Sequence, residues 1–302
     1  MYFGSVRFFK HLILGLLVLL ITVPLAVSVA LGVQNYAYRA QLGLAEEQSN
    51  TGMRAAAAEL EETMPPQVDE PEPSPSPEPP VYQSLYPEMY APAAAWGTVD
   101  TDKTVYLTFD DGPSAQTPQI LELLEGYGVK ASFFAVGRED EQSKQWMRDV
   151  VAAGHTLGAH GYTHDYKKMY ASVEAYLEDF HQIYELIFEA TGAHPAVFRF
   201  PGGSVNGYNA GVYKGLIAEM ERRGFVYCDW NVDAADTAAN VKTENVVRRA
   251  LAGTSDRRAV VLLHDGGDGA VLSALPAIIE GYQAAGFTFA VLTPEVRQVT
   301  LG

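Results

Sequence analysis

The sequence contains a single cysteine, Cys228, among 302 residues. One cysteine excludes a disulfide within the chain, and the apolar residues around it predict a buried small hydrophobic side chain. Basic residues are also scarce, because 21 Lys and Arg stand against 37 Asp and Glu, a formal net charge of −16. A protein that binds nucleic acid needs a basic surface, so this composition predicts no nucleic-acid partner.

Charged side chains are almost absent from residues 11–33, where only the first position is ionisable. This apolar stretch is long enough to span a bilayer. Arg7 and Lys10 precede it, which predicts a cytoplasmic tail (1–10), a single transmembrane signal-anchor (11–33) and an extracytoplasmic remainder at the cell membrane. The alternative is a signal peptide that is cleaved at the small residues of Val-Ser-Val-Ala, which would give a secreted protein. The length of the apolar run favours the anchor.

Apolar periodicity is weak in the next segment, residues 34–96, which we interpret as a stalk and linker. Residues 34–63 are rich in Ala, Glu and Gln and have loose helical character. Residues 65–92 are dominated by Pro, Glu and Ser, a composition that cannot bury apolar area and is typical of a stiff, extended spacer. Residues 97–302 have the composition of a globular domain.

Short apolar runs alternate with helical patterns in this last part of the chain. Strands are predicted at 105–109, 132–136, 156–159, 196–200, 225–229, 259–263 and 288–292. Helices are predicted at 116–127, 141–153, 173–191, 209–223, 243–252 and 271–285. The alternation predicts an α/β fold, with a parallel sheet and helices outside it. Functional groups of such folds gather at the carboxyl ends of the strands. The candidate site residues lie at or just after the ends of predicted strands; they are Asp110, Asp111, His160, Arg199, Gly202, Asp233 and His264.

Two short motifs carry metal chemistry. Thr-Phe-Asp-Asp-Gly at 108–112 ends a predicted strand in two carboxylates, whose side chains should point in different directions if the strand continues through them. His-Gly-Tyr-Thr-His at 160–164 holds two imidazoles four residues apart, so one helical turn would place both on one face. One carboxylate and two histidines commonly hold a catalytic zinc and leave a position for water. The second carboxylate is then free to act as a base, although each motif alone also fits a structural role.

These motifs resemble those of the polysaccharide deacetylases, the family-4 carbohydrate esterases with a NodB-homology domain. Three more motifs follow in the order of that family: Arg-Phe-Pro-Gly-Gly at 199–203, Asp-Ala-Ala-Asp at 233–236 and Leu-Leu-His at 262–264. The resemblance covers roughly residues 98–302. It implies a distorted (β/α) barrel of about seven strands, and seven strands are also the number predicted from the pattern.

The resemblance implies a role for each matching residue around a metal. Asp111, His160 and His164 would ligate one divalent ion, expected to be Zn²⁺. Asp110 would be the general base that activates a water molecule. Arg199 would pair with this carboxylate, because a neighbouring guanidinium keeps a carboxylate ionised and oriented.

The resemblance also implies how the leaving group and the oxyanion are handled. Gly202 would offer its backbone N–H to the oxyanion. His264 would be the general acid that protonates the leaving amine. Asp236 would orient and charge this histidine, because a carboxylate beside an imidazole raises its pKa, and Asp233 is the fallback for this role.

The chain departs from the family pattern at four positions. Asp165 replaces the proline that frequently follows the second histidine. Gly161 stands where a Ser or Thr usually braces the histidine motif. Gly202 replaces an aromatic residue that forms one wall of the cleft, and Thr237 replaces a tryptophan. Trp230 is a candidate for the lost sugar-stacking surface.

The resulting hypothesis is a zinc-dependent N-deacetylase that acts on a cell-surface polysaccharide, with peptidoglycan as the favoured substrate. An anchor, a spacer and an extracytoplasmic domain suit a polymer at a distance from the membrane. Deacetylation of chitin oligosaccharides or of acetylated xylan is the alternative within the enzyme class. A non-catalytic polysaccharide-binding protein on the same scaffold is the alternative outside it.

Overall fold

A computed structural model describes residues 79–91, 97, 101–267 and 269–301, which belong to one compact unit, Glu78–Gly302. The predicted cytoplasmic tail (1–10), transmembrane segment (11–33) and most of the stalk and linker (34–96) lie outside the described residues. None of the helices in the described part combines the length and the hydrophobicity that crossing a membrane requires.

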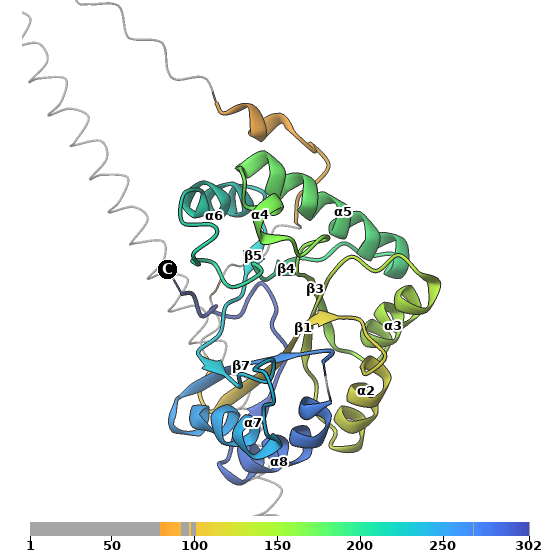
Figure 1. Ribbon diagram of the computed structural model, residues 1–302, viewed down its shortest axis with the longest axis vertical. Helices are drawn as coiled ribbons and strands as arrows, with labels where there is room; N and C mark the ends of the chain where they lie inside the picture. The colour runs from red at the N-terminus through yellow and green to blue at the C-terminus, as the bar shows by residue number, and fades with distance from the viewer. Residues whose placement is uncertain (1–78, 92–96, 98–100, 268, 302) are drawn as a thin grey trace, which may run out of the picture. The chain divides into compact units, whose positions relative to one another are not determined.

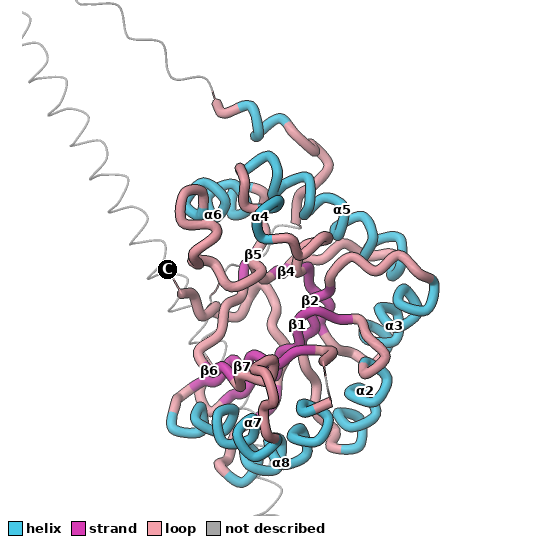
Figure 2. Tube along the Cα trace, in the orientation of Figure 1, coloured by secondary structure: helices cyan, strands magenta, loops and turns pink. Residues whose placement is uncertain are grey.

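A parallel sheet runs through the middle of this unit (Figure 2). Its strands are β1 (Thr104–Gly112), β2 (Ser132–Ala135), β3 (Thr156–Ala159), β4 (Val197–Phe198), β5 (Val226–Tyr227), β6 (Val232–Asp233), β7 (Arg258–His264) and β8 (Thr288–Phe289). Seven of them follow one path in the order β5-β4-β3-β2-β1-β7-β6. Strand β8 pairs with the beginning of β1, whose later residues pair with β2.

The path is open, because β5 and β6 form its two ends and do not pair within the described residues. The segment between them bonds elsewhere: the Cys228 N–H donates to the Phe198 carbonyl, and the Asp229 N–H donates to the carbonyl of Val299 near the carboxyl terminus. The prediction of an α/β fold with a parallel sheet is therefore confirmed, with a half-barrel in place of a closed barrel. Cys228 itself is buried, as predicted, and burial raises the pKa of its thiol to about 12.

Helices cover the outside of the sheet (Figure 1). They are α2 (Thr117–Gly126), α3 (Glu141–Ala152), α4 (Tyr166–Met169), α5 (Val173–Thr191), α6 (Tyr213–Arg222), α7 (Thr243–Ala250) and α8 (Ala270–Ala284). The bounds predicted for α5 agree with the structure because its ends carry local signals. The Ser172 side chain accepts from the Ala175 N–H at its start, and Gly192 adopts the left-handed conformation (φ 75°) at its end.

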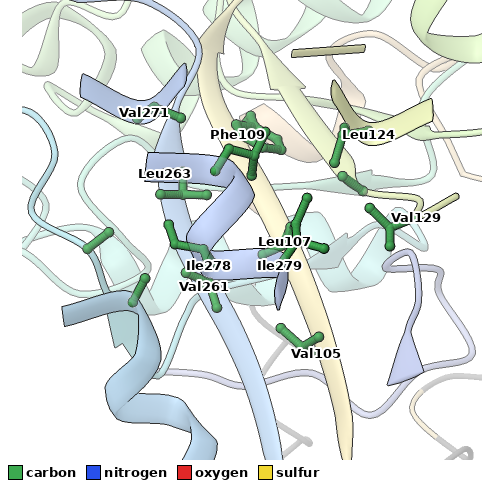
Figure 3. Close-up of a cluster of buried hydrophobic side chains, with 14 of the residues drawn as sticks. Val105, Leu107, Phe109, Leu124, Val129, Val261, Leu263, Val271, Ile278 and Ile279 are labelled. Carbon is green, nitrogen blue, oxygen red and sulfur yellow. The ribbon is translucent and has the colours of Figure 1, made fainter. Parts of the chain in front are cut away.

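The largest apolar cluster lies between the sheet and α2 and α8 (Figure 3). Alternate residues of β1, namely Val105, Leu107 and Phe109, face Ile278 and Ile279 of α8. All five side chains are fully buried. Burying side chains of this size contributes roughly 1.5–3 kcal/mol each, so β1 and β7 form a rigid base for the polar groups at their carboxyl ends.

Residues 79–91, here called the N-terminal strap, pack onto the domain, so the prediction of a linker that extends to residue 96 is wrong for them. The strap begins with a 3₁₀ helix (Val81–Ser84) and carries the fully buried Met89. Arg223, at the end of α6, is completely buried and bonds to Glu219. Its guanidinium also donates to strap carbonyls, those of Tyr82, Leu85, Tyr86 and Met89. Composition did not reveal the strap because its order comes from this distant arginine.

A protein that begins at residue 97 should be less stable than one that begins at residue 79. Removing the strap leaves the Arg223 guanidinium paired with Glu219 but without its carbonyl acceptors, and it also removes the buried Met89 side chain, whose burial contributes roughly 1.5–3 kcal/mol. Urea unfolding of the two proteins, followed by circular dichroism, measures the difference. Equal midpoints and slopes would show that the strap does not belong to the folded unit.

Candidate metal and catalytic site

A cavity of about 300 Å³ opens at the carboxyl ends of the strands. The lining includes every residue that the sequence assigned to a site except Arg199 and Asp236; it comprises Asp110, Asp111, His160, His164, Tyr166, Gly202, Trp230, Asp233, Ala235, Thr237, Ala238, Leu262 and His264. A second cavity of about 550 Å³ shares four of these residues, namely Asp111, Thr237, Ala238 and His264. The two cavities therefore form one extended cleft, a shape suited to a polymer.

Strand β1 changes its geometry where the two carboxylates lie. Its pairing with β2 is irregular between Asp110 and Gly112, and Asp111 has a positive φ of 68°. The alternation expected from a continuous strand is thus interrupted. Asp110 Oδ2 lies 3.5 Å and Asp111 Oδ1 3.6 Å from the Nε2 atom of His160, so both carboxylates approach the same imidazole. Asp110 is buried, whereas the Asp111 side chain is 38% exposed.

The two histidines of the second motif lie on a loop after β3, and the helical turn expected from their spacing is absent. Gly161 and His164 both have positive φ values, 83° and 54°. This sharp loop nevertheless brings the rings of His160 and His164 to 5.2 Å between centroids. Ligand atoms of Asp111, His160 and His164 all lie within 4.8 Å of one another, so the structure brings the three predicted ligands together.

The atoms that face each other in this cluster suit a divalent cation. His160 Nδ1 lies 3.0 Å from the Arg199 carbonyl and donates to it, which leaves Nε2 with a free electron pair toward Asp111. Burial lowers the pKa of His160 to about 3, so the ring is neutral, the form that binds metals. Asp111 Oδ1 is buried and accepts no hydrogen bond from the residues that the structure describes. An unsatisfied buried carboxylate oxygen beside two imidazoles fits a bound ion.

Asp179 of α5 holds the histidine loop, a contact that the sequence analysis missed. Its carboxylate accepts the backbone N–H of Tyr162 (2.6 Å) and of Thr163 (3.0 Å), and also the Thr163 hydroxyl. A Cβ atom at Gly161 would lie 3.0 Å from Asp179 Oδ1, so a larger residue would crowd this carboxylate. The brace expected from a Ser or Thr at position 161 thus comes from Asp179. The sequence did contain one signal of this role, because Asp179 is an acidic residue on the otherwise apolar face of the helix predicted at 173–191.

The variant Asp179→Asn should weaken metal binding about 10–100-fold, the usual effect of losing a group that orients a ligand. The amide presents a donor to N–H groups that need an acceptor, so the loop between His160 and His164 loosens. Titration with Zn²⁺ against a competing chelator measures the affinity. Glu178→Gln is the matched control, because it removes one charge from the adjacent, exposed position of α5. Equal affinity in both variants would exclude Asp179 as the brace.

Arg199 joins the metal cluster to Asp110. It is completely buried, and its Nη1 donates to Asp110 Oδ1 and to the Thr108 hydroxyl, both at 2.8 Å. Its remaining nitrogens donate to the carbonyls of Cys228 and Asp229. Burial raises the pKa of Asp110, while the charge and hydrogen bond of Arg199 oppose this rise. A guanidinium fixed by four hydrogen bonds leaves Asp110 Oδ2 facing His160.

His264 lies opposite Asp110 because the two residues are partners in the β1–β7 ladder. Asp236 Oδ2 accepts the His264 backbone N–H (2.8 Å), and its Oδ1 lies 2.9 Å from the ring Nδ1. Burial tends to lower the pKa of His264, but the hydrogen bond and charge of Asp236, with help from Asp110 and Asp111, raise it to about 9. The fallback residue Asp233 instead accepts the Ala235 N–H and is exposed. The imidazole is thus held in the protonated form.

Two further groups complete the wall of the cavity. Gly202 adopts a φ of 75°, and its N–H has no acceptor among the described residues, so it can serve an external oxygen. Trp230 lines the cavity with its ring 5.5 Å from the Arg199 guanidinium carbon. Thr237 is exposed at the place where the two cavities join.

Comparison with known proteins places these features in a family. The sequence profile described as Polysaccharide deacetylase matches residues 98–224. A peptidoglycan-N-acetylglucosamine deacetylase of Bacillus cereus is 31% identical over 192 residues, which cover 62% of this chain and 68% of that protein. A bifunctional xylanase/deacetylase of Pseudobutyrivibrio xylanivorans is 35% identical over a region that covers 62% of this chain and 29% of that protein. The crystal structure of the catalytic domain of peptidoglycan N-acetylglucosamine deacetylase from Eubacterium rectale matches with a TM-score of 0.62 at 36% identity, over 65% of this chain and 92% of that one.

Proposed function

This chain belongs to the polysaccharide deacetylase family, and we propose that it is a metal-dependent hydrolase that removes N-acetyl groups from peptidoglycan. The observation that carries the proposal is the pairing of Asp110 with His264 across one cavity that also contains Asp111, His160 and His164. A carboxylate and a protonated imidazole then face each other beside a cluster that fits a cation. Amide hydrolysis needs this set: a group that accepts a proton, a group that donates one and a site for the carbonyl oxygen.

Asp111, His160 and His164 would hold the divalent ion, for which we propose Zn²⁺. When bound, such an ion polarises the acetamide carbonyl and lowers the pKa of an attacking water. Two imidazoles and one carboxylate are a donor set that zinc commonly takes. The neutral state of His160 and the unsatisfied Asp111 Oδ1 support this assignment.

Asp110 accepts a proton as a water oxygen forms its bond to the acetyl carbon. The hydrogen bond from Arg199 keeps this carboxylate oriented during the transfer. The N–H of Gly202 donates to the carbonyl oxygen as negative charge develops on it, and such donors usually contribute ~10²–10³ in rate. His264 donates its proton to the amide nitrogen as the C–N bond breaks, so the products are acetate and a free amino sugar.

Peptidoglycan is favoured as the substrate because the Bacillus cereus relative and the Eubacterium rectale structure are both described as peptidoglycan N-acetylglucosamine deacetylases. An extended cleft of two joined cavities suits a glycan strand. We also propose that residues 11–33 anchor the chain in the cell membrane, with residues 97–302 outside the cytoplasm. The Pro, Glu and Ser of residues 65–78 would then hold the domain away from the bilayer.

Acetate release by the purified protein tests the proposal. Peptidoglycan, chitin oligomers and acetylated xylan are compared with and without a chelator, followed by restoration with Zn²⁺. We expect the highest rate on peptidoglycan, loss of activity with chelator and recovery with the metal. A higher rate on acetylated xylan would favour the substrate suggested by the bifunctional xylanase/deacetylase of Pseudobutyrivibrio over peptidoglycan. Binding of these glycans without any acetate release would support the non-catalytic alternative.

A further inference from the structure

Three aromatic rings form a row that leads from the candidate metal cluster to the surface. The ring of Tyr166 lies 5.2 Å from that of His164 and 5.1 Å from that of Tyr208, measured between centroids. Tyr166 lines the cavity, and Tyr208 is 55% exposed, which is high for a large aromatic side chain. Exposed aromatic surface that continues from a cavity is typical of a binding site. This row starts at a ligand candidate and ends in solvent.

The Tyr166 hydroxyl is directed toward the loop that offers its N–H to the substrate. A Cβ atom built on Gly202 would lie 3.5 Å from this hydroxyl oxygen. The hydroxyl makes no hydrogen bond to any residue in the described part of the chain, so it can bond to a sugar. Tyr166 thus supplies the aromatic wall that Gly202 lacks.

The backbone around both tyrosines is held in place before any ligand binds. Asp165 caps α4 by accepting the N–H groups of Lys167 and Lys168. Asn206 Oδ1 accepts the Tyr208 N–H at 2.8 Å, and Asn206 Nδ2 donates to the carbonyls of Pro201 and Gly203. Asn206 therefore fixes the shape of the single loop that carries both Gly202 and Tyr208. Preorganisation of this kind reduces the entropy lost on binding.

We propose that Tyr166 and Tyr208 form a sugar-binding subsite for the residue of the glycan next to the acetylated sugar that reacts. The inference rests on the proposed function and extends it in two ways. Substrate affinity should increase with the length of the glycan, and the glycan should leave the cavity past Tyr166 and Tyr208. The apolar face of a pyranose ring packs on an aromatic face, while its hydroxyls find partners such as the Tyr166 hydroxyl. Continuity with the cavity singles out a glycan as the occupant.

The test uses the full-length protein with bound Zn²⁺ and N-acetylglucosamine oligomers, a disaccharide and a longer chain. Covering about 50 Å² of apolar ring surface corresponds to roughly tenfold in binding. Tyr208→Ala should therefore raise KM for the longer oligomer roughly tenfold, with a smaller effect on the disaccharide. Tyr208→Phe keeps the ring and should restore most of the affinity, whereas Tyr166→Phe should lose only the contribution of the hydroxyl.

Phe188→Ala is the matched control, because Phe188 is also an exposed ring (44%) that stacks on an imidazole, that of His194, but it lies outside the cavity. This control should behave as the parent protein on both oligomers. Equal KM values for Tyr208→Ala and the parent on the longer oligomer would overturn the subsite and leave the proposed function intact. If the parent releases no acetate from these oligomers or from peptidoglycan, the proposed function fails. Calorimetric binding of the same oligomers then decides the subsite: it stands if Tyr208→Ala binds more weakly than the parent and falls if both bind equally.

Discussion

Replacing Asp110 with asparagine should lower the rate of acetate release at least ~10²-fold while the bound metal stays nearly unchanged. The amide keeps the shape of the carboxylate and can keep the hydrogen bond from Arg199 Nη1. It cannot accept a proton from water, so the variant loses the base without losing the site. Rates at substrate saturation, together with metal content by atomic absorption, measure the two effects separately.

His160→Ala serves as the contrasting variant, because it should lose metal and activity together. The imidazole of His160 faces both carboxylates and is held by the Arg199 carbonyl. Without it, only Asp111 and His164 remain to ligate the metal. Parental activity in Asp110→Asn would exclude Asp110 as the base. Loss of metal from Asp110→Asn would instead show that Asp110 is a metal ligand. This alternative is worth testing because Asp110 Oδ2 lies only 3.5 Å from His160 Nε2.

The strand ends could be located from the sequence because local patterns determine them. The apolar run that ends at Asp110 forms a strand whose partner ends at His264, and parallel strands bring their carboxyl ends to one edge. Strand β6 was not predicted because its two residues, Val232 and Asp233, do not belong to an apolar run, and α4 is a single turn after the histidine motif. Predicted helix bounds agree best where a cap is present, as at Ser172 and Gly192 of α5.

The support around the site could not be predicted, since it depends on contacts between distant parts of the chain. Asp179 lies on α5 and reaches back to Tyr162 and Thr163, and no local rule links them. The helical spacing of the two histidines was misleading, because the positive φ of Gly161 breaks any helix. Arg223 likewise orders the N-terminal strap from more than a hundred residues away, against the prediction from composition.

The pH dependence should depend on the pair of His264 and Asp236. A histidine whose pKa is raised to about 9 donates its proton below that pH and loses this ability as the pH rises through it. Binding of a divalent ion at Asp111 removes part of the negative charge that sustains this pKa. The alkaline limb of the pH–rate profile is therefore expected below pH 9 in the metal-loaded enzyme. Partial removal of the metal should lower the rate at every pH and leave this limb in place, because metal-free molecules do not turn over.

The substitution Asp236→Asn should move this alkaline limb to lower pH. It removes the charge that raises the pKa of His264, while burial, which lowers this pKa, remains. If the pKa falls below about 6, less than roughly a tenth of the imidazole is protonated at pH 7, so the rate there should drop about tenfold or more and recover toward acidic pH. His264→Ala should lose at least ~10²-fold at every pH, because no acid remains. Asp233→Asn is the matched control, since its carboxylate makes no contact with His264 and should leave the limb in place. An unshifted limb in Asp236→Asn would mean that another group donates the proton, and the pairing of Asp236 with His264 would then be structural only.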